Sequence, residues 1–174
     1  KGWGVLPHWA GYIAVDNVDA MALDFQRGGG VICRPPADIP GVARFAVVAD
    51  PQGAIVSIMT PLEEDRRSAT WPTPGSAGTV GWNELMAGDW ATAWDFYAAR
   101  FGWEKDMAVD MDAMGTYQTF KLGDRGIGGM MMRESLTAVM AARAGRPVPA
   151  SKRRHHPLVA NLPWRWRFYR SGLY

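Results

Sequence analysis

The sequence predicts an α+β fold built from two β-α-β-β-β modules, paired so that their mixed sheets curl with the helices on the outside. Two observations lead to this prediction. The same order of segments, a strand, a helix and then short strands, occurs twice with a spacing of about 70 residues. Turn and helix-cap residues separate these segments at corresponding places in both copies. An isolated module exposes a large apolar face, so we expect the modules to pack on each other or on a second chain.

The first copy begins with an aromatic and β-branched run at residues 8–15, which predicts a strand. Residues 16–17, an Asp-Asn pair, can cap the helix that follows, and the three glycines at 28–30 end it. A turn at residues 50–53, with proline in its second position, separates the last two strands. The three strands after the helix are predicted at residues 31–34, where two prolines stop the strand, at 43–48 and at 54–59.

The second copy repeats this order from residue 79 onward. Residues 79–86 predict a strand, Asp89 is the expected helix cap, and Gly102 ends the helix. Aromatic residues recur at helical spacing and are expected to form the core face of this helix: Trp90, Trp94, Phe96, Tyr97 and Phe101. Later strands are expected at 109–111, 115–122 and 126–132, which leaves open whether this copy lacks one strand.

Composition and charge divide the chain into four parts. These are a module at 4–62, a linker at 63–77, a module at 78–132 and a basic tail at 133–174. Residues 1–132 hold 16 acids and 10 bases, whereas the tail holds nine bases and one acid. We expect the tail to be disordered or non-native and to dock weakly at most, although residues 164–168 alternate as an edge strand would.

Several protein classes are excluded by composition. No run of about 18 apolar residues predicts a membrane span, and no signal segment opens the chain. The single cysteine, Cys33, excludes an internal disulfide and makes a cytoplasmic location the expectation. We expect a small-molecule ligand and a homodimer as partners, and neither a membrane nor a nucleic acid.

Particular motifs resemble the vicinal oxygen chelate superfamily, which includes glyoxalases, bleomycin-resistance proteins and extradiol dioxygenases. Residues 13–19, 29–30 and 49–53 are similar to the second module of a family domain. Residues 85–89, 96–97 and 101–103 are similar to the opening of a first module. The chain thus resembles an internal portion of a two-domain, four-module member, and a truncated or frameshifted gene product is one reading of its ends.

The resemblance also implies where a divalent metal would be bound. Family ligands are a His or Gln in a first strand and a Glu in a last strand, and the matching positions here are Ala10, Trp82 and Ser57. None offers a ligand for a divalent metal, so we expect no cofactor, and a metal is implied by resemblance alone. His8 and Glu84 each lie two residues from a family position and share its face of the strand, which makes them candidate displaced metal ligands.

Glu84 is also the candidate catalytic residue, as a general acid or base. Four side chains are candidate ligand-binding residues in an aromatic-lined cavity, with core packing as the alternative: Tyr12, Trp82, Tyr117 and Met130. The expected function is that of a glyoxalase-like or dioxygenase-like protein that acts on or binds an unidentified small molecule. The alternatives are a metal-free sequestering module and a family member without activity.

Overall fold

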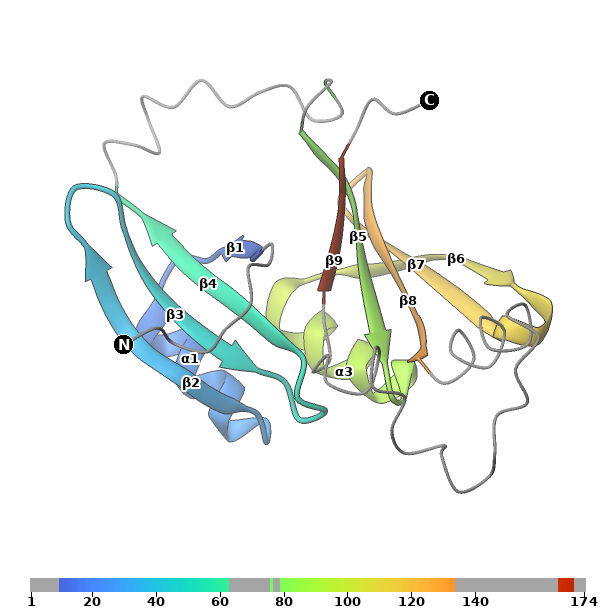
Figure 1. Cartoon of the computed structure of the whole chain (residues 1–174), viewed down its shortest axis with the longest axis horizontal. Coiled ribbons are helices and arrows are strands. Elements are labelled where there is room, and N and C mark those ends of the chain that lie inside the picture. The colour runs from blue at the N-terminus through green and yellow to red at the C-terminus, as the bar shows by residue number, and fades with distance from the viewer. Residues whose placement is uncertain (1–9, 63–75, 77–78, 134–165, 171–174) are drawn as a thin grey trace, which may run out of the picture.

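A computed structural model of the chain describes residues 10–62, 76, 79–133 and 166–170, the last range for its backbone only. The predictions about His8, the linker at 63–77 and most of the tail therefore lie outside the described residues. Within the described ranges, two β-α-β-β-β modules follow one another (Figure 1). No helix in them is long and apolar enough to cross a membrane.

The first module is a four-stranded sheet with one helix. Its elements are β1 (Tyr12–Ala14), α1 (Val18–Arg27), β2 (Val31–Ile39), β3 (Ala43–Ala49) and β4 (Ile55–Pro61). The strand order is β1-β4-β3-β2, with β1 parallel to β4 and the other pairs antiparallel. A parallel pair at one edge and antiparallel pairs beyond it make this a mixed sheet, as predicted.

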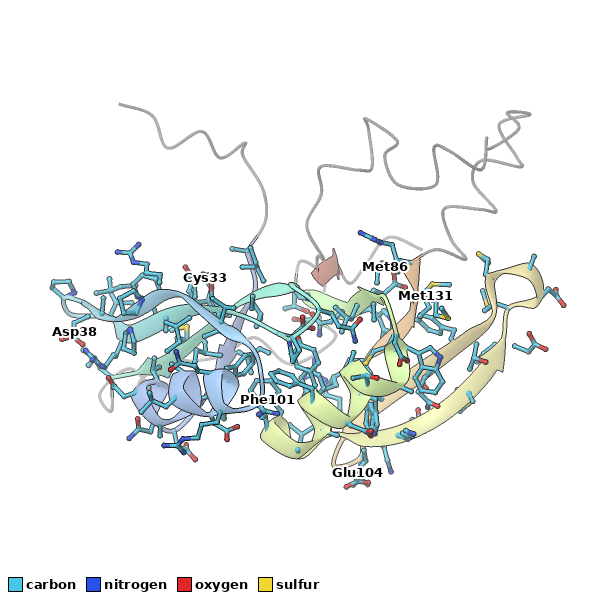
Figure 2. All side chains as sticks on the ribbon, turned by 90° about the horizontal axis from the view of Figure 1, so that it is seen from below. Cys33, Asp38, Met86, Phe101, Glu104 and Met131 are labelled. Atoms are coloured by element: carbon cyan, nitrogen blue, oxygen red, sulfur yellow. The ribbon has the colours of Figure 1, made fainter. Side chains whose placement is uncertain are left out.

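The second module has the same topology. Its elements are β5 (Val80–Ala87), α3 (Trp90–Phe101), β6 (Glu104–Asp110), the 3-10 turn η1 (Asp112–Met114), β7 (Thr116–Leu122) and β8 (Arg125–Met132). The order β6-β7-β8-β5 repeats the first sheet, and β5 is parallel to β8. The predicted fold class is confirmed, and both helices lie on the same side of the two sheets (Figure 2).

One detail of the strand prediction is wrong, and one question that the sequence left open has an answer in the structure. The prolines at 35–36 do not stop β2, which continues to Ile39 with irregular register on either side of Arg34. An edge strand tolerates proline because the missing N–H can face away from the sheet, and β2 is such an edge. The second module lacks no strand, since β6 covers Glu104–Asp110. Its charged, exposed sequence hides the alternation that identifies a half-buried strand.

Helix ends follow the predicted cap residues. The Asn17 side chain accepts a hydrogen bond from Ala20 N–H, and the Asp89 side chain accepts from Ala91 and Thr92. Gly102 ends α3 in the left-handed conformation, with φ of 64°. Buried residues of both helices belong to one hydrophobic cluster.

The two modules share one hydrophobic core. Phe25 of α1 is fully buried and lies edge-on to Phe96 and Tyr97 of α3, with ring centroids 5.0 and 6.4 Å away. The buried cluster around them joins residues of both helices and both sheets. The modules therefore pack on each other through their helices, which was one of the two arrangements expected.

The tail sequence alternates as an edge strand would, and the backbone contains a strand in this region. Residues Trp166–Arg170 form β9, which pairs antiparallel with β5. In this register Arg167 stands opposite Glu84, and Tyr169 stands opposite Trp82. The division of the chain into domains remains a prediction.

Candidate functional site

Three of the predicted site residues meet on the face of the second sheet that points away from α3, called here the distal face. The Trp82 indole N–H donates a hydrogen bond to the Tyr117 hydroxyl oxygen at 2.7 Å. The Tyr117 hydroxyl donates in turn to Glu84 Oε1 at 3.0 Å. All three side chains are half-buried. The result is a directed hydrogen-bond chain from an indole through a phenol to a carboxylate.

The strand order explains how these side chains reach each other. Trp82 and Glu84 alternate along β5 and so project from the same face, while Tyr117 comes from β7, with β8 in between. Gly129 of β8 stands beside Glu84 in the register, and a Cβ there would overlap the Tyr117 ring. The glycine therefore makes room for the tyrosine to cross β8. Sequence reasoning missed Gly129, although glycine inside a strand often marks such a close approach.

Methionines border this hydrogen-bond chain. Met86 and Met131 are register partners on β5 and β8 and are both buried. Figure 2 places them on the side of the sheet away from α3. A flexible thioether adapts its shape to neighbouring apolar groups, so the distal face combines a polar line with an adaptable apolar border.

The other predicted residues lie elsewhere. Met130 is fully buried among the residues packed against α3, because it follows Gly129 and so projects from the opposite face of β8. Of the two expectations for Met130, ligand binding and core packing, the structure shows core packing. Tyr12 belongs to the first sheet, is 50% exposed, and lies 6.4 Å from the Phe45 ring. It does not join the cluster around Glu84.

The positions implied for a divalent metal do not fit one. Ala10 is an exposed residue before β1, Ser57 is buried in β4, and Trp82 offers only an N–H donor. Among the described residues, no group of three or more His, Cys, Asp or Glu side chains could hold an ion. Glu84 alone supplies too few donors for a tight site. The metal content of the protein remains a prediction.

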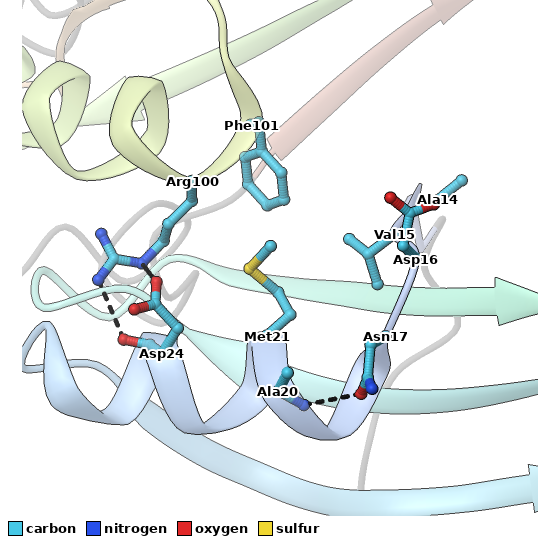
Figure 3. A pocket seen from close by; sticks show the side chains of 9 residues that line it. All are labelled: Ala14, Val15, Asp16, Asn17, Ala20, Met21, Asp24, Arg100 and Phe101. Atoms are coloured by element: carbon cyan, nitrogen blue, oxygen red, sulfur yellow. Dashed lines mark hydrogen bonds and ion pairs between the residues drawn. The ribbon is translucent and has the colours of Figure 1, made fainter.

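A separate pocket of about 430 Å³ lies where the beginning of α1 meets the end of α3 (Figure 3). Asp16 and Asn17 lie at one end, and Arg100 with Asp24 at the other. Met21 and Phe101 lie between them. No sequence pattern pointed to this pocket, because its walls come from two modules.

Arg100 closes one end of the pocket and bridges the modules. Its terminal nitrogens donate to the carbonyl oxygens of Phe96 at 2.8 Å and Asp24 at 3.0 Å. Its Nε lies 3.0 Å from Asp24 Oδ2, close enough for an ion pair although not aligned for a hydrogen bond. The guanidinium also stacks over the Phe96 ring at 3.8 Å. This end of the pocket is therefore held by several contacts between α1 and α3.

Comparison with known proteins identifies relatives of parts of the chain. No family model matches. A Mycobacterium bovis protein named "Putative glyoxylase CFP32" is 51% identical over 61 residues, covering 35% of this chain and 23% of its own length. The anthracycline biosynthesis protein DauV of Streptomyces sp. (strain C5) is 35% identical over 94 residues, covering 54% of this chain and 33% of its own.

Solved structures with a similar arrangement include a glyoxylase/bleomycin resistance/dioxygenase domain from Frankia and glyoxalase I of Leishmania major. The first has a TM-score of 0.45 and 10% identity, covering 74% of this chain and 98% of the other. The second has a TM-score of 0.45 and 11% identity, covering 77% and 91%.

The sequence relatives, together with the repeated β-α-β-β-β topology, confirm the resemblance to the vicinal oxygen chelate superfamily. The sequence similarity covers parts of this chain and parts of relatives that are named as a glyoxylase and as anthracycline biosynthesis proteins. It spans 23% to 33% of the length of the curated relatives that it matches.

Proposed function

We propose that this chain is a small-molecule binding part of a glyoxalase-like protein and that the ligand lies on the distal face of the second sheet. The hydrogen-bond chain from Trp82 through Tyr117 to Glu84 is the observation that carries this proposal. Side chains that are only partly buried and yet hold each other in one geometry are typical of a preorganised binding site.

The chemistry of the site favours a planar ligand that carries a hydroxyl group. The indole and phenol rings offer flat apolar surface, and the neighbouring methionines can adapt to a ring system. The Trp82 N–H and the Tyr117 O–H already donate within the chain. A carboxylate can accept several hydrogen bonds, so Glu84 suits a hydrogen-bond donor of the ligand in addition to Tyr117, and a phenol or enol hydroxyl provides one. Two of the relatives are named as anthracycline biosynthesis proteins.

Two functions use the same arrangement. In a sequestering module, Glu84 only accepts the ligand's hydrogen bond. In an enzyme, Glu84 takes the proton from the ligand hydroxyl, and Tyr117 keeps the carboxylate oriented during the transfer. The family positions without metal ligands, Ala10, Ser57 and Trp82, favour the sequestering function.

The proposal is tested by isothermal titration calorimetry with a dihydroxyanthraquinone as the probe and unsubstituted anthraquinone as the reference. We expect the hydroxylated probe to bind more tightly to the full chain. Tyr117→Phe removes the hydroxyl that orients Glu84, and Glu84→Gln removes the carboxylate. Each substitution is expected to weaken binding roughly tenfold, which is about 1.4 kcal/mol.

Tyr12→Phe is the matched control, because it also removes a tyrosine hydroxyl. This hydroxyl belongs to the corresponding distal face of the first sheet, the face that points away from α1. Its affinity for the probe should equal that of the unaltered chain. Equal binding of the two quinones, or equal losses in Tyr12→Phe and Tyr117→Phe, would contradict the proposed site. Conversion of the probe, followed by chromatography, separates catalysis from sequestering.

A further inference from the structure

Glu84 lies on β5, which has a neighbouring strand on each side. One neighbour is β8, and the other is β9 (Figure 1). On the β8 side, the residue beside Glu84 is Gly129, and Tyr117 reaches across it to donate to the carboxylate at 3.0 Å. On the β9 side, the residue beside Glu84 is Arg167. The carboxylate of the candidate site therefore lies between a phenol and the register position of an arginine.

The alternation of residues along β9 favours this register over its neighbours. Trp166 stands opposite Leu85, a fully buried residue of the core cluster. Phe168 follows two positions later and belongs to the same face of the strand. Arg167 comes between them, so its position lies on the distal face together with Glu84. A slip by one residue would exchange the two faces and bring the arginine to the core. The sequence of β9 thus specifies where Arg167 lies.

Charge and reach favour an ion pair at this position. Directly opposed residues of an antiparallel pair have Cβ atoms about 4.5–5.5 Å apart, which a long arginine side chain can span. Glu84 is half-buried, and partial burial of a carboxylate costs free energy unless a cation compensates. An ionised carboxylate has about four acceptor positions, so it can accept from Tyr117, from an arginine and from a ligand together.

We propose that Arg167 is a positioning residue of the ligand site, which pairs with Glu84 and holds the carboxylate in the orientation that accepts the ligand's hydroxyl group. Tyr117 holds the carboxylate from the β8 side, and Arg167 holds it from the β9 side. The tail strand is then part of the site, and ligand binding depends on its docking against β5. The role toward the ligand rests on the proposed function, whereas the pairing rests on the strand register alone.

The pairing is tested first without a ligand, by proton–nitrogen NMR of the Trp82 indole N–H in the full chain. The signal is assigned by its loss in Trp82→Phe. Because the indole donates to Tyr117 and Tyr117 donates to Glu84, a rotation of the carboxylate alters the indole signal. Arg167→Gln should shift this signal, and Arg167→Lys, which keeps the charge, should restore part of its original position. In a Glu84→Gln background, Arg167→Gln should cause no further shift.

The role toward the ligand is tested by calorimetric titration of the same variants with the dihydroxyanthraquinone probe. Arg167→Gln should weaken binding roughly fivefold, and this loss should shrink as salt is added. The double variant Arg167→Gln with Glu84→Gln should bind no more weakly than Glu84→Gln alone, because Arg167 acts through the carboxylate.

Arg170→Gln is the matched control, because Arg170 lies on the same strand but stands opposite Val80, beyond a register shift. It should change neither the indole signal nor the affinity, and circular dichroism confirms that each variant folds. An unshifted signal in Arg167→Gln, or an equal shift in the Glu84→Gln background, would overturn the pairing. Unchanged affinity in a variant with a shifted signal would overturn the positioning role. An unaltered chain that does not bind the probe would overturn the proposed function and this role with it, while the indole signal still decides the pairing.

Discussion

The distal faces of the two sheets carry different chemistry on the same topology. In the first module this face holds Tyr12 and Phe45, with the Arg34 guanidinium 4.7 Å from the centre of the Phe45 ring. In the second it holds the chain from Trp82 to Glu84. One face thus presents a cation on an aromatic ring, and the other presents a carboxylate oriented by a phenol.

The sides that face the helices are much more alike. Each helix begins at a side-chain cap and buries an aromatic residue at the same position of the repeat, Phe25 in α1 and Tyr97 in α3. These two rings meet in the shared core. The module interface therefore constrains the side chains on the helix side, while the side chains of the distal face differ between the two modules.

The largest expected effect comes from the shared core. Phe25→Ala leaves a cavity beside Phe96, Tyr97 and Phe101, and we expect the free energy of unfolding to fall by about 3–5 kcal/mol. Because the cavity belongs to both modules, both should unfold together in one transition at lower denaturant concentration. Chemical denaturation followed by fluorescence and circular dichroism measures this.

Leu23→Ala is the control for this substitution, because Leu23 lies on the same helix but is 46% exposed. It should change stability by well under 1 kcal/mol. Two separate transitions in Phe25→Ala, one of them unshifted, would show that the modules are independent and that the comparison of a common interface is wrong.

A smaller effect is expected from the β3–β4 turn, which joins the modules because its Gln52 side chain contacts the start of α3. Gln52→Ala leaves the N–H groups of Gly88 and Asp89 without their acceptor, which costs about 1–3 kcal/mol. Arg125→Ala, at the exposed start of β8 beside the β7–β8 turn, should change stability by no more than about 0.5 kcal/mol. Thermal melting of dilute protein compares the two. Equal losses would mean that the two turns do not differ in their docking.

The elements that local sequence determines could be predicted, and they define most of the fold. The glycines after each helix, the caps at its start and the alternation in β5 and β7 are local signals. They place Trp82, Glu84 and Tyr117 on one face. The phase of residues 130–132 could not be predicted, because three methionines in a row fit either face of a strand.

Contacts between distant segments left no local signal. Gln52 looks like an ordinary turn residue, and its partners at Gly88 and Asp89 are 36 and 37 positions away. The pocket beside α1 likewise depends on Arg100 and Asp24, which are 76 residues apart. Such features follow from how the modules pack, which no periodicity within one module contains.

Gly129, which lies beneath the Tyr117 ring, is a further difference between the distal faces of the two sheets. Gly129→Ala places a methyl group against the Tyr117 ring, so the ring must move and its hydrogen bond to Glu84 is lost. We expect a loss of about 1–3 kcal/mol and a changed NMR shift of the Trp82 indole proton. Gly126→Ala is the matched control on the same strand, because its methyl group would meet Trp82 at an ordinary 3.6 Å. A normal indole signal in Gly129→Ala would contradict this account of the site.

The smallest expected effect is a difference between the two helix caps in how their contribution to stability depends on pH. Asp89 caps α3, and hydrogen bonds from the Thr92 hydroxyl and the Ala91 N–H hold its pKa below the ordinary 3.8. Because the pKa is lower in the folded state, the stabilisation is present above that ordinary value and is lost as the pH falls through the folded value. Asn17 caps α1 and has no such titration.

Denaturation midpoints measured between about pH 5 and pH 2 test this difference between the caps. Asp89→Asn keeps a capping side chain and should flatten part of the acid loss, whereas Asn17→Asp should add a new acid loss in α1. Asp19, whose pKa the Arg44 guanidinium also lowers, contributes with the same sign, and buried Asp50 with the opposite sign. Both are unchanged in the variants, so the difference from the unaltered chain belongs to the cap. An acid slope identical in all three proteins would show that Asp89 stabilises α3 no better in its charged form than in its neutral form.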